Sequence, residues 1–421
     1  MKLNSILNRL FKNPKFKDKF FYPLLKDPFN KQDLIEGIKV ILSKQITMSH
    51  KTLEFEKIFR KKIKVKNSLM VNSGSSANLL SMQCLINPYR KKRLKQGDEV
   101  LIPALCWSTS LWPIVQSGLK PVFVDINISD LNINLNDLEK KITKKTRAIM
   151  LVHVLSNSTD MDRLLKLKKK YDLIIIEDTC ESLGTKYKKK YLGTFGDFST
   201  FSFYYSHQIT SGEGGMVCCK DRADYEIIRS LRSHGWSRGL IKEKIIAKTF
   251  KKLDPKFIFY NSGFNLRPTD ISAAIGCNQF KRLDKFAAIR SYNRSKIINS
   301  IKKDSRWNNQ ITFIESRKHI KSSWFGLPFY LNIKSQLYKS LFIKRLEKLG
   351  IETRPIISGS FTNQPSAKKY KLIKKNQIFR NADFINNHGL FVGLHTEKIS
   401  NKILKLFKNS IYTALNYKKN S

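Results

Sequence analysis

The sequence predicts an α/β fold with a mainly parallel sheet in a large domain, followed by a smaller α+β domain at the C-terminal end. Short apolar runs alternate with helical stretches up to about residue 270, an order typical of βαβ units with right-handed crossovers. Longer helical stretches follow. A chain of 421 residues with 41% hydrophobic content can bury more than one core.

Four apolar runs are the expected strands of the parallel sheet. They are EVLIPAL at 99–105, KPVFVDI at 120–126, TRAIMLVHV at 146–154 and DLIIIEDT at 172–179. Continuous apolar runs are typical of strands that are covered on both faces. Helices are expected between them at 108–118 and 161–171, and a hairpin-like stretch at 184–204 adds further strands.

The last third of the chain predicts a second domain. A long helical segment at 270–301 precedes an apolar strand at 324–331 and a helix at 335–350. We therefore expect a basic N-terminal extension over residues 1–30, a large domain over 31–285 and a small domain over 286–421.

The formal net charge of +46 would attract nucleic acid, an anionic membrane or a nucleotide-bearing substrate. Drift in composition is the favoured explanation of the charge, because the lysines lie in short, dispersed clusters. No nucleic-acid-binding signature accompanies them, so we expect no nucleic-acid partner. Without a long apolar run or a signal-peptide pattern, we expect a cytoplasmic protein without a membrane partner.

The cysteine pattern indicates neither a metal site nor a disulfide framework. The six cysteines are scattered along the chain, without a Cys-x-x-Cys pair or a histidine at zinc-finger spacing. We therefore expect reduced thiols and no metal.

A small-residue turn, NSGSS at 72–76, follows an apolar run and begins a helix. Unpaired backbone N–H groups and the helix dipole favour an anion at such a turn. The hydroxyls of Ser75 and Ser76 could then contact a phosphate. Taken alone, the motif also fits an ordinary helix cap.

Further polar or aromatic residues lie where strands are expected to end. Asp178 closes the run IIIED, and Trp107 lies at a strand-to-helix junction. Ser202 and His207 lie in FSFYYSHQITSGEGG, whose glycine-rich turn lets backbone approach a flat ligand. Each also fits a structural role, as a turn cap for Asp178, a satisfied imidazole for His207 and a core side chain for Trp107.

The order of these motifs resembles the DegT/DnrJ/EryC1/StrS sugar aminotransferase family of fold-type-I enzymes, which bind pyridoxal 5′-phosphate (PLP). The resemblance runs from ITMSHKTLEFEKIF to GLFVGLHTE, with a departure at Ser49, where the family commonly has Gly. It implies that 31–285 is the PLP-binding domain and that the enzyme is a homodimer. The implied cofactor ligands are Ser75, Ser76 and Ser202 for the phosphate, Trp107 for the ring face, Asp178 for the ring nitrogen, Glu181 three positions on, and Asn265 from the neighbouring subunit.

One position departs from the family pattern in a way that changes the chemistry. Family aminotransferases carry a Schiff-base lysine in SFYxxK, whereas this chain has His207. The nearby lysines at 186, 188, 189, 190 and 220 do not match that position. The substitution resembles the sugar 3-dehydratase branch, which implies pyridoxamine 5′-phosphate (PMP), His207 as the base, and loss of the C3 hydroxyl from a nucleotide-linked 4-keto-6-deoxy sugar.

The branch divides into two types. One, acting on a CDP-linked sugar, holds an iron–sulfur cluster with a Cys-x-Cys pair, but here Cys218 and Cys219 are adjacent. The pattern favours the cluster-free type, which acts on GDP-4-keto-6-deoxymannose, regenerates PMP from glutamate and supplies dideoxysugars for surface polysaccharide such as lipopolysaccharide O antigen.

Two further residues match active-site positions of that type. His234, in RSHGWSRG, is a second candidate catalytic histidine or an interface residue. Arg354, in GIETRP, is a candidate substrate ligand or a solvated arginine. The stretch 235–264 looks like an insertion. The iron–sulfur type, an aminotransferase using another lysine and a non-catalytic regulatory relative remain as alternatives.

Overall fold

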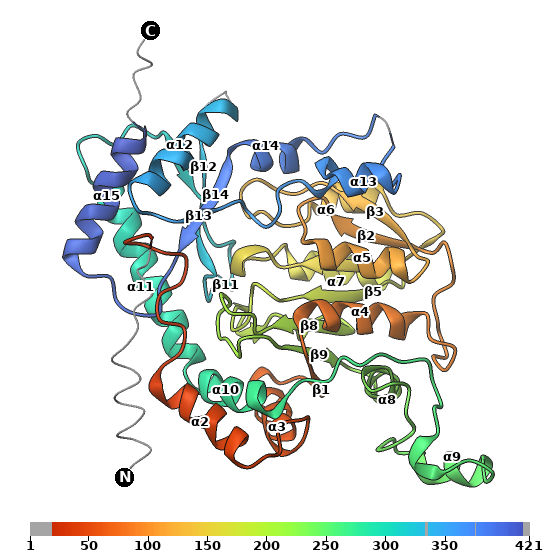
Figure 1. Ribbon diagram of the computed structural model, residues 1–421. Helices are drawn as coiled ribbons and strands as arrows, with labels where there is room; N and C mark the ends of the chain where they lie inside the picture. The colour runs from red at the N-terminus through yellow and green to blue at the C-terminus, as the bar shows by residue number, and fades with distance from the viewer. Residues whose placement is uncertain (1–18, 333–335, 375, 416–421) are drawn as a thin grey trace.

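The computed structural model describes residues 19–332, 336–374 and 376–415 (Figure 1). Most of the predicted N-terminal extension, residues 1–18, lies outside these ranges. Within them, no helix is long and apolar enough to cross a membrane.

A seven-stranded sheet forms the centre of the molecule, with strand order β1-β9-β8-β5-β4-β2-β3. Its strands are β1 (Asn67–Val71), β2 (Glu99–Pro103), β3 (Lys120–Val124), β4 (Thr146–Val152), β5 (Ile174–Asp178), β8 (Phe198–Ser202) and β9 (Gly215–Cys219). Strands β3, β2, β4, β5 and β8 pair in parallel, and β9 is antiparallel to both of its neighbours. The predicted mainly parallel sheet is therefore confirmed.

Helices cover both faces of this sheet (Figure 1). They are α3 (His50–Ile63), α4 (Gly74–Leu85), α5 (Ser108–Gln116), α6 (Leu135–Lys140), α7 (Met161–Lys170), α8 (Arg222–Arg232) and α10 (Asp270–Lys281). Helix α2 (Lys31–Leu42) packs on α10 (Figure 1). Successive residues of β2 show the two faces. Val100 joins the core of α4, α5 and α8, whereas Leu101 joins that of α6 and α7. This alternation explains why the strands are apolar without interruption.

The helical stretch predicted over 270–301 is two helices, α10 and α11 (Leu283–Lys302), separated at Arg282. The Arg282 guanidinium forms an ion pair with the buried Asp33 carboxylate of α2. This contact connects residues 249 positions apart, so the local helical pattern carried no sign of the interruption.

The small domain has a four-stranded antiparallel sheet of order β10-β12-β14-β13. Its elements are β10 (Ile311–Phe313), β12 (Gly326–Leu331), α12 (Gln336–Lys348), β13 (Thr353–Arg354), β14 (Gly389–Gly393) and α15 (Asn401–Leu415). All of them except β13 contribute side chains to an apolar core that they share with α11. Helices α13 (Pro365–Lys369) and α14 (Arg380–His388) instead pack side chains such as Ala367 and Ile385 on the large-domain core. The limit at residue 285 stays a prediction.

Shorter elements complete the chain. They are a three-stranded sheet of β6 (Lys186–Tyr187), β7 (Lys190–Tyr191) and β11 (Ile320–Lys321), the helix α9 (Glu243–Thr249), and the 3-10 turns η1 (Val154–Ser156), η2 (Pro255–Phe257) and η3 (Phe361–Asn363). The pair β6–β7 is the hairpin predicted within 184–204. Helix α9 projects away from the sheet at the lower right of Figure 1.

Candidate active site

A cavity of about 620 Å³ opens where β4, β5 and β8 end, the edge at which α/β sheets bind ligands. Side chains from both domains line it. The candidate residues along its wall are Ser75, Trp107, Asp178, Glu181, Ser202, His207 and Arg354. Three other candidates, Ser76, His234 and Asn265, do not line it within the described part of the chain.

The N-terminus of α4 forms one end of the cavity. Its first N–H groups have no acceptor within the helix, which suits an anion. A Cβ atom at Gly74 would lie 2.6 Å from Ser202 Cβ and 2.8 Å from Cys180 Sγ, so only glycine allows this close approach. The Ser75 hydroxyl donates to Thr109 Oγ1 at 2.9 Å. Ser76 is buried and serves the helix cap instead, since its N–H donates to Ser73 Oγ at 3.1 Å.

Asp178 is held in place by two donors on other elements. Its Oδ2 atom accepts from Asn78 Nδ2 at 2.8 Å and from Ser110 Oγ at 2.7 Å. Asn78 is itself fixed, because its Oδ1 accepts from Thr200 Oγ1 at 2.6 Å. A buried carboxylate with these neutral donors remains an acceptor for a positively charged group. The sequence reasoning missed Asn78 and Ser110, although each lies one helical turn after a candidate residue, Ser75 and Trp107 respectively.

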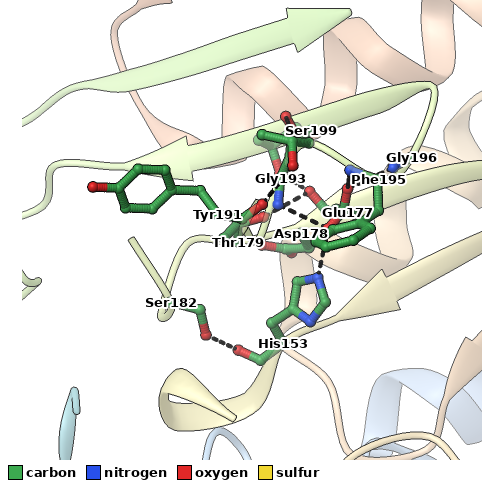
Figure 2. Close-up of polar contacts among 12 residues, drawn as sticks. His153, Glu177, Asp178, Thr179, Ser182, Tyr191, Gly193, Phe195, Gly196 and Ser199 are labelled. Atoms are coloured by element: carbon green, nitrogen blue, oxygen red, sulfur yellow. Dashed lines mark hydrogen bonds and ion pairs between the residues drawn. The ribbon is translucent and has the colours of Figure 1, made fainter. Parts of the chain in front are cut away.

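Glu177, the residue before Asp178, stabilises the same end of β5 from the opposite face of the sheet. Its buried carboxylate accepts from the backbone N–H groups of Gly193 at 2.7 Å, Phe195 at 2.8 Å and Gly196 at 2.6 Å. Figure 2 shows His153 Nε2 pointing at the same carboxylate, 3.0 Å away. These contacts fix the strand end that carries Asp178.

The protonation of His207 follows from its contacts. Its Nδ1 lies 2.8 Å from the Cys180 carbonyl oxygen. Because a carbonyl can only accept, Nδ1 carries the hydrogen, and Nε2 of the neutral ring is an acceptor. The ring meets Phe325 edge-on, with centroids 5.1 Å apart. Burial lowers the pKa of His207 to about 4, against the opposing effects of the Cys180 carbonyl and Asp178. The imidazole is therefore neutral at pH 7.

Glu181 and Trp107 complete the wall. Burial raises the pKa of Glu181 to about 7, although its carboxylate accepts from the Leu155 N–H at 3.1 Å. Trp107 is 54% exposed at the N-cap of α5, which argues against a core role. It lines the cavity, where an indole can stack on a flat ring.

Arg354 lies at the small-domain side of the cavity. Its Nη2 is 3.2 Å from Glu352 Oε1, and Glu352 Oε2 accepts from the Leu24 N–H at 2.9 Å. Leu24, Leu25 and Glu352 also line the cavity. Sequence reasoning missed these three, because residues 328 positions apart meet only in the fold.

His234 and Asn265 lie beside each other at the base of the 235–264 stretch. The His234 N–H donates to the Phe264 carbonyl at 2.7 Å, and Ser233 pairs with Asn265 in an isolated bridge. Asn265 is exposed, and its Oδ1 accepts from Arg267 Nε at 3.1 Å. Within one chain, these two candidates are therefore assembled with each other but apart from His207.

Comparison with known proteins gives consistent relatives. Residues 29–404 match the DegT/DnrJ/EryC1/StrS aminotransferase family. The GDP-4-keto-6-deoxy-D-mannose 3-dehydratase of Escherichia coli O55:H7 is 35% identical over 384 residues, covering 91% of this chain and 97% of that protein. A solved structure of the E. coli dehydratase with bound hydrated PLP has 34% identity and a TM-score of 0.85, covering 93% of this chain and 99% of that one. GDP-perosamine synthase of E. coli O157:H7 is 33% identical over 318 residues, covering 76% of this chain and 79% of that protein.

Proposed function

The chain belongs to the DegT/DnrJ/EryC1/StrS aminotransferase family, and from this premise we propose that it is a nucleotide-sugar 3-dehydratase. The substrate is a nucleotide-linked 4-keto-6-deoxy sugar, GDP-4-keto-6-deoxymannose, which loses its C3 hydroxyl. The observation that carries the proposal is His207. It lines the cavity at the family's lysine position, and no lysine of the described ranges lines that cavity.

The family's cofactor is PLP or PMP, and the cavity residues fit it. The close approach at Gly74, the start of α4 and the hydroxyls of Ser75 and Ser202 suit its phosphate. Asp178 suits a protonated ring nitrogen, because its carboxylate is held by neutral donors alone. Trp107, which is exposed and lines the cavity, is the proposed cover for a ring face. When bound, PMP supplies a free amine and a ring that takes up electrons.

Three residues of the chain, Asp178, His207 and Glu181, have proposed roles in holding or moving protons. Asp178 holds the proton on the ring nitrogen, so that the ring retains its positive charge. Nε2 of His207 accepts and returns the proton that moves during loss of the hydroxyl, since its Nδ1 is committed to the Cys180 carbonyl. Glu181, whose pKa is raised to about 7, can be neutral or charged near physiological pH.

Arg354 is the proposed anion ligand for the nucleotide diphosphate or for glutamate. Its guanidinium suits phosphate and carboxylate alike. Glutamate regenerates PMP and leaves as 2-oxoglutarate, while ammonia is released. The net charge of +46 would raise the local concentration of both anions.

The proposed enzyme is a homodimer in which Asn265 and His234 complete the neighbouring chain's site. Both lie outside the cavity of their own chain. The adjoining stretch exposes large apolar side chains, namely Ile241, Ile245, Leu253, Phe257 and Phe259. A second copy of the chain would bury such a surface.

A sugar aminotransferase is the second candidate, favoured by the family description and by the perosamine synthase relative. It requires a lysine near the cofactor. Lys186 and Lys190 lie on the β6–β7 hairpin, and Lys220 Nζ donates to the Phe195 carbonyl at 2.6 Å. The cavity geometry therefore favours the dehydratase.

The test is turnover with defined components. Purified protein, PMP, glutamate and GDP-4-keto-6-deoxymannose should give the 3-deoxy sugar, 2-oxoglutarate and ammonia without any reductase. Omitting glutamate should limit product to one equivalent of PMP. Transfer of the amino group to C4 with the C3 hydroxyl retained, or an absolute need for an iron–sulfur reductase, would refute the proposal.

A further inference from the structure

Arg290 on α11 is a buried cation behind residues 204–208, the loop that carries the proposed base His207 and is called the base loop below. Arg290 has no role in the proposed reaction so far. Its side chain is 3% exposed. Its Nη1 donates to the Gln208 carbonyl at 3.1 Å, Nη2 to the His207 carbonyl at 3.5 Å and Nε to the Leu394 carbonyl at 3.2 Å. Burial lowers its pKa to about 10, so it remains charged at pH 7.

The bonding partners of Arg290 are unusual for a buried charge. Buried guanidinium groups are commonly paired with carboxylates, as Arg294 is with Glu315 one turn further along α11, at 2.7 Å. Arg290 instead has backbone carbonyl acceptors, and it forms no ion pair with a carboxylate among the described residues. Its positive charge is therefore not cancelled locally, and it acts on its surroundings.

Two of the three carbonyls belong to the loop that carries the base, and the third follows β14 in the small domain. Arg290 therefore connects the base loop of the large domain with the small domain. A planar guanidinium can hold three acceptors in fixed directions at once. A shorter or neutral side chain would leave buried carbonyls without a donor, which is costly.

The charged groups around His207 act in opposite directions. Asp178, at the end of β5, favours the imidazolium form, as does the Cys180 carbonyl. Arg290, from α11, favours the neutral form. Glu181 is only partly ionised at pH 7 because its pKa is about 7, and burial keeps the Cys180 thiol protonated. Tyr204 and Phe325 present ring edges. Arg290 is the cation that opposes Asp178.

We propose that Arg290 is a positioning residue for His207, which fixes the 204–208 loop through its carbonyls and, together with burial of the ring, keeps the imidazole neutral so that Nε2 is available as a base. The role of Arg290 in catalysis rests on the proposed function of His207. The effect of Arg290 on the protonation of His207 is independent of that function and can be measured without turnover.

The experiment is a ¹³C NMR titration of histidine-labelled full-length protein, with the His207 signal assigned by its loss in His207→Asn. In the wild type, His207 should titrate well below its ordinary value of about 6.5. Arg290→Met, which removes the charge, should raise the His207 pKa by about one unit or more. Arg290→Lys should keep the low pKa of His207 while lowering kcat. It retains the positive charge but lacks the planar guanidinium that bonds three carbonyls at once. Arg294→Met, on the same helix, is the matched control and should leave His207 unchanged.

Two outcomes overturn the inference. One is a wild-type His207 that titrates at or above 6.5, which decides the matter even if Arg290→Met fails to fold. The other is an Arg290→Met protein in which the His207 pKa and the acid limb of kcat/KM are both unchanged. Absence of dehydration by the wild type would instead refute the proposed function and leave the titration result standing.

Discussion

The cavity floor, formed by Asp178, Ser202 and His207, differs from the arm, which comprises residues 233–265. Asp178 and His207 are tied by hydrogen bonds to α4, α5 and the loop after β5 within one chain. The arm carries His234 and Asn265, yet neither lines the cavity. The floor motifs and the arm motifs both match the same family, yet only the floor residues line the cavity of their own chain. The difference fits the proposed homodimer, in which one chain preassembles the floor and a second copy supplies the arm.

The arm is ordered by contacts within itself and with the segments beside it, such as the Tyr89 hydroxyl, which donates to the Tyr260 carbonyl at 2.9 Å. Trp236 pairs with Phe259 in an isolated bridge, and the guanidinium groups of Arg238 and Arg267 lie 5.0 and 5.6 Å from the Trp236 ring. A Cβ at Gly235 would lie 1.7 Å from the Asn261 carbonyl oxygen, so the two ends of the arm touch closely. A structured segment with an exposed apolar surface is suited to docking.

Among these predictions, replacing the proposed base His207 should lower activity the most. His207→Asn retains a side chain of similar reach but cannot accept a proton near neutral pH. We expect kcat to fall by about 10³-fold, with cofactor affinity within about twofold by absorbance titration. Steady-state assays with GDP-4-keto-6-deoxymannose measure the loss. A decrease of less than about tenfold would place the base elsewhere.

Replacing Asp178, the proposed partner of the ring nitrogen, should have the second-largest effect on kcat. Asp178→Asn keeps the hydrogen-bonding shape but removes the negative charge, and Asn78 and Ser110 remain as donors. We expect kcat to fall by about 10²-fold, because the ring nitrogen loses its proton more readily. The absorbance spectrum of the bound cofactor should shift with it. Unchanged turnover would show that Asp178 is only a turn cap.

Complementation would test whether the arm serves the other chain. His207→Asn and Asn265→Asp homodimers should each be poorly active, the second because a carboxylate repels phosphate. Mixed and reassembled, half of the dimers are heterodimers with one intact site, so activity should recover to about a quarter of the wild type.

The control for complementation mixes two floor variants, His207→Asn and Asp178→Asn. Every site in those heterodimers retains one defect, so no recovery is expected. Equal activity in the two mixtures, or none above the parents in the first, would show that the arm acts within its own chain.

The smallest expected effect is a change in the free energy of unfolding when Glu181, beside the floor in the cavity wall, is replaced. The pKa of Glu181 in the folded chain, about 7, lies above the value of 4.5 expected when unfolded. The folded state therefore binds this proton more tightly, and the resulting stability is lost as the pH rises through 7. Glu181→Gln stays neutral, so at pH 8 it should be more stable than the wild type by about 1 to 2 kcal/mol, without that gain at pH 4. Urea unfolding of cofactor-free protein measures this, and an equal difference at both pH values would contradict it.

Local patterns predicted the elements whose causes are local. The parallel strands follow from continuous apolar runs, and α5 and α7 begin and end near the expected residues. The interruption at Arg282 depends on Asp33, far away in the chain, so it could not be predicted. The site divides in the same way. Motif order pointed to Asp178 and His207, whereas Arg290 reaches its acceptors only through the fold.

The most direct test of the central claim, that His207 replaces a covalent lysine tether, is the intact mass of the protein after PLP loading and borohydride reduction. The wild type should keep the mass of the unmodified chain. His207→Lys should gain the mass of one reduced cofactor, because it restores an amine at that position. A wild-type chain that gains one cofactor on any lysine would contradict the account.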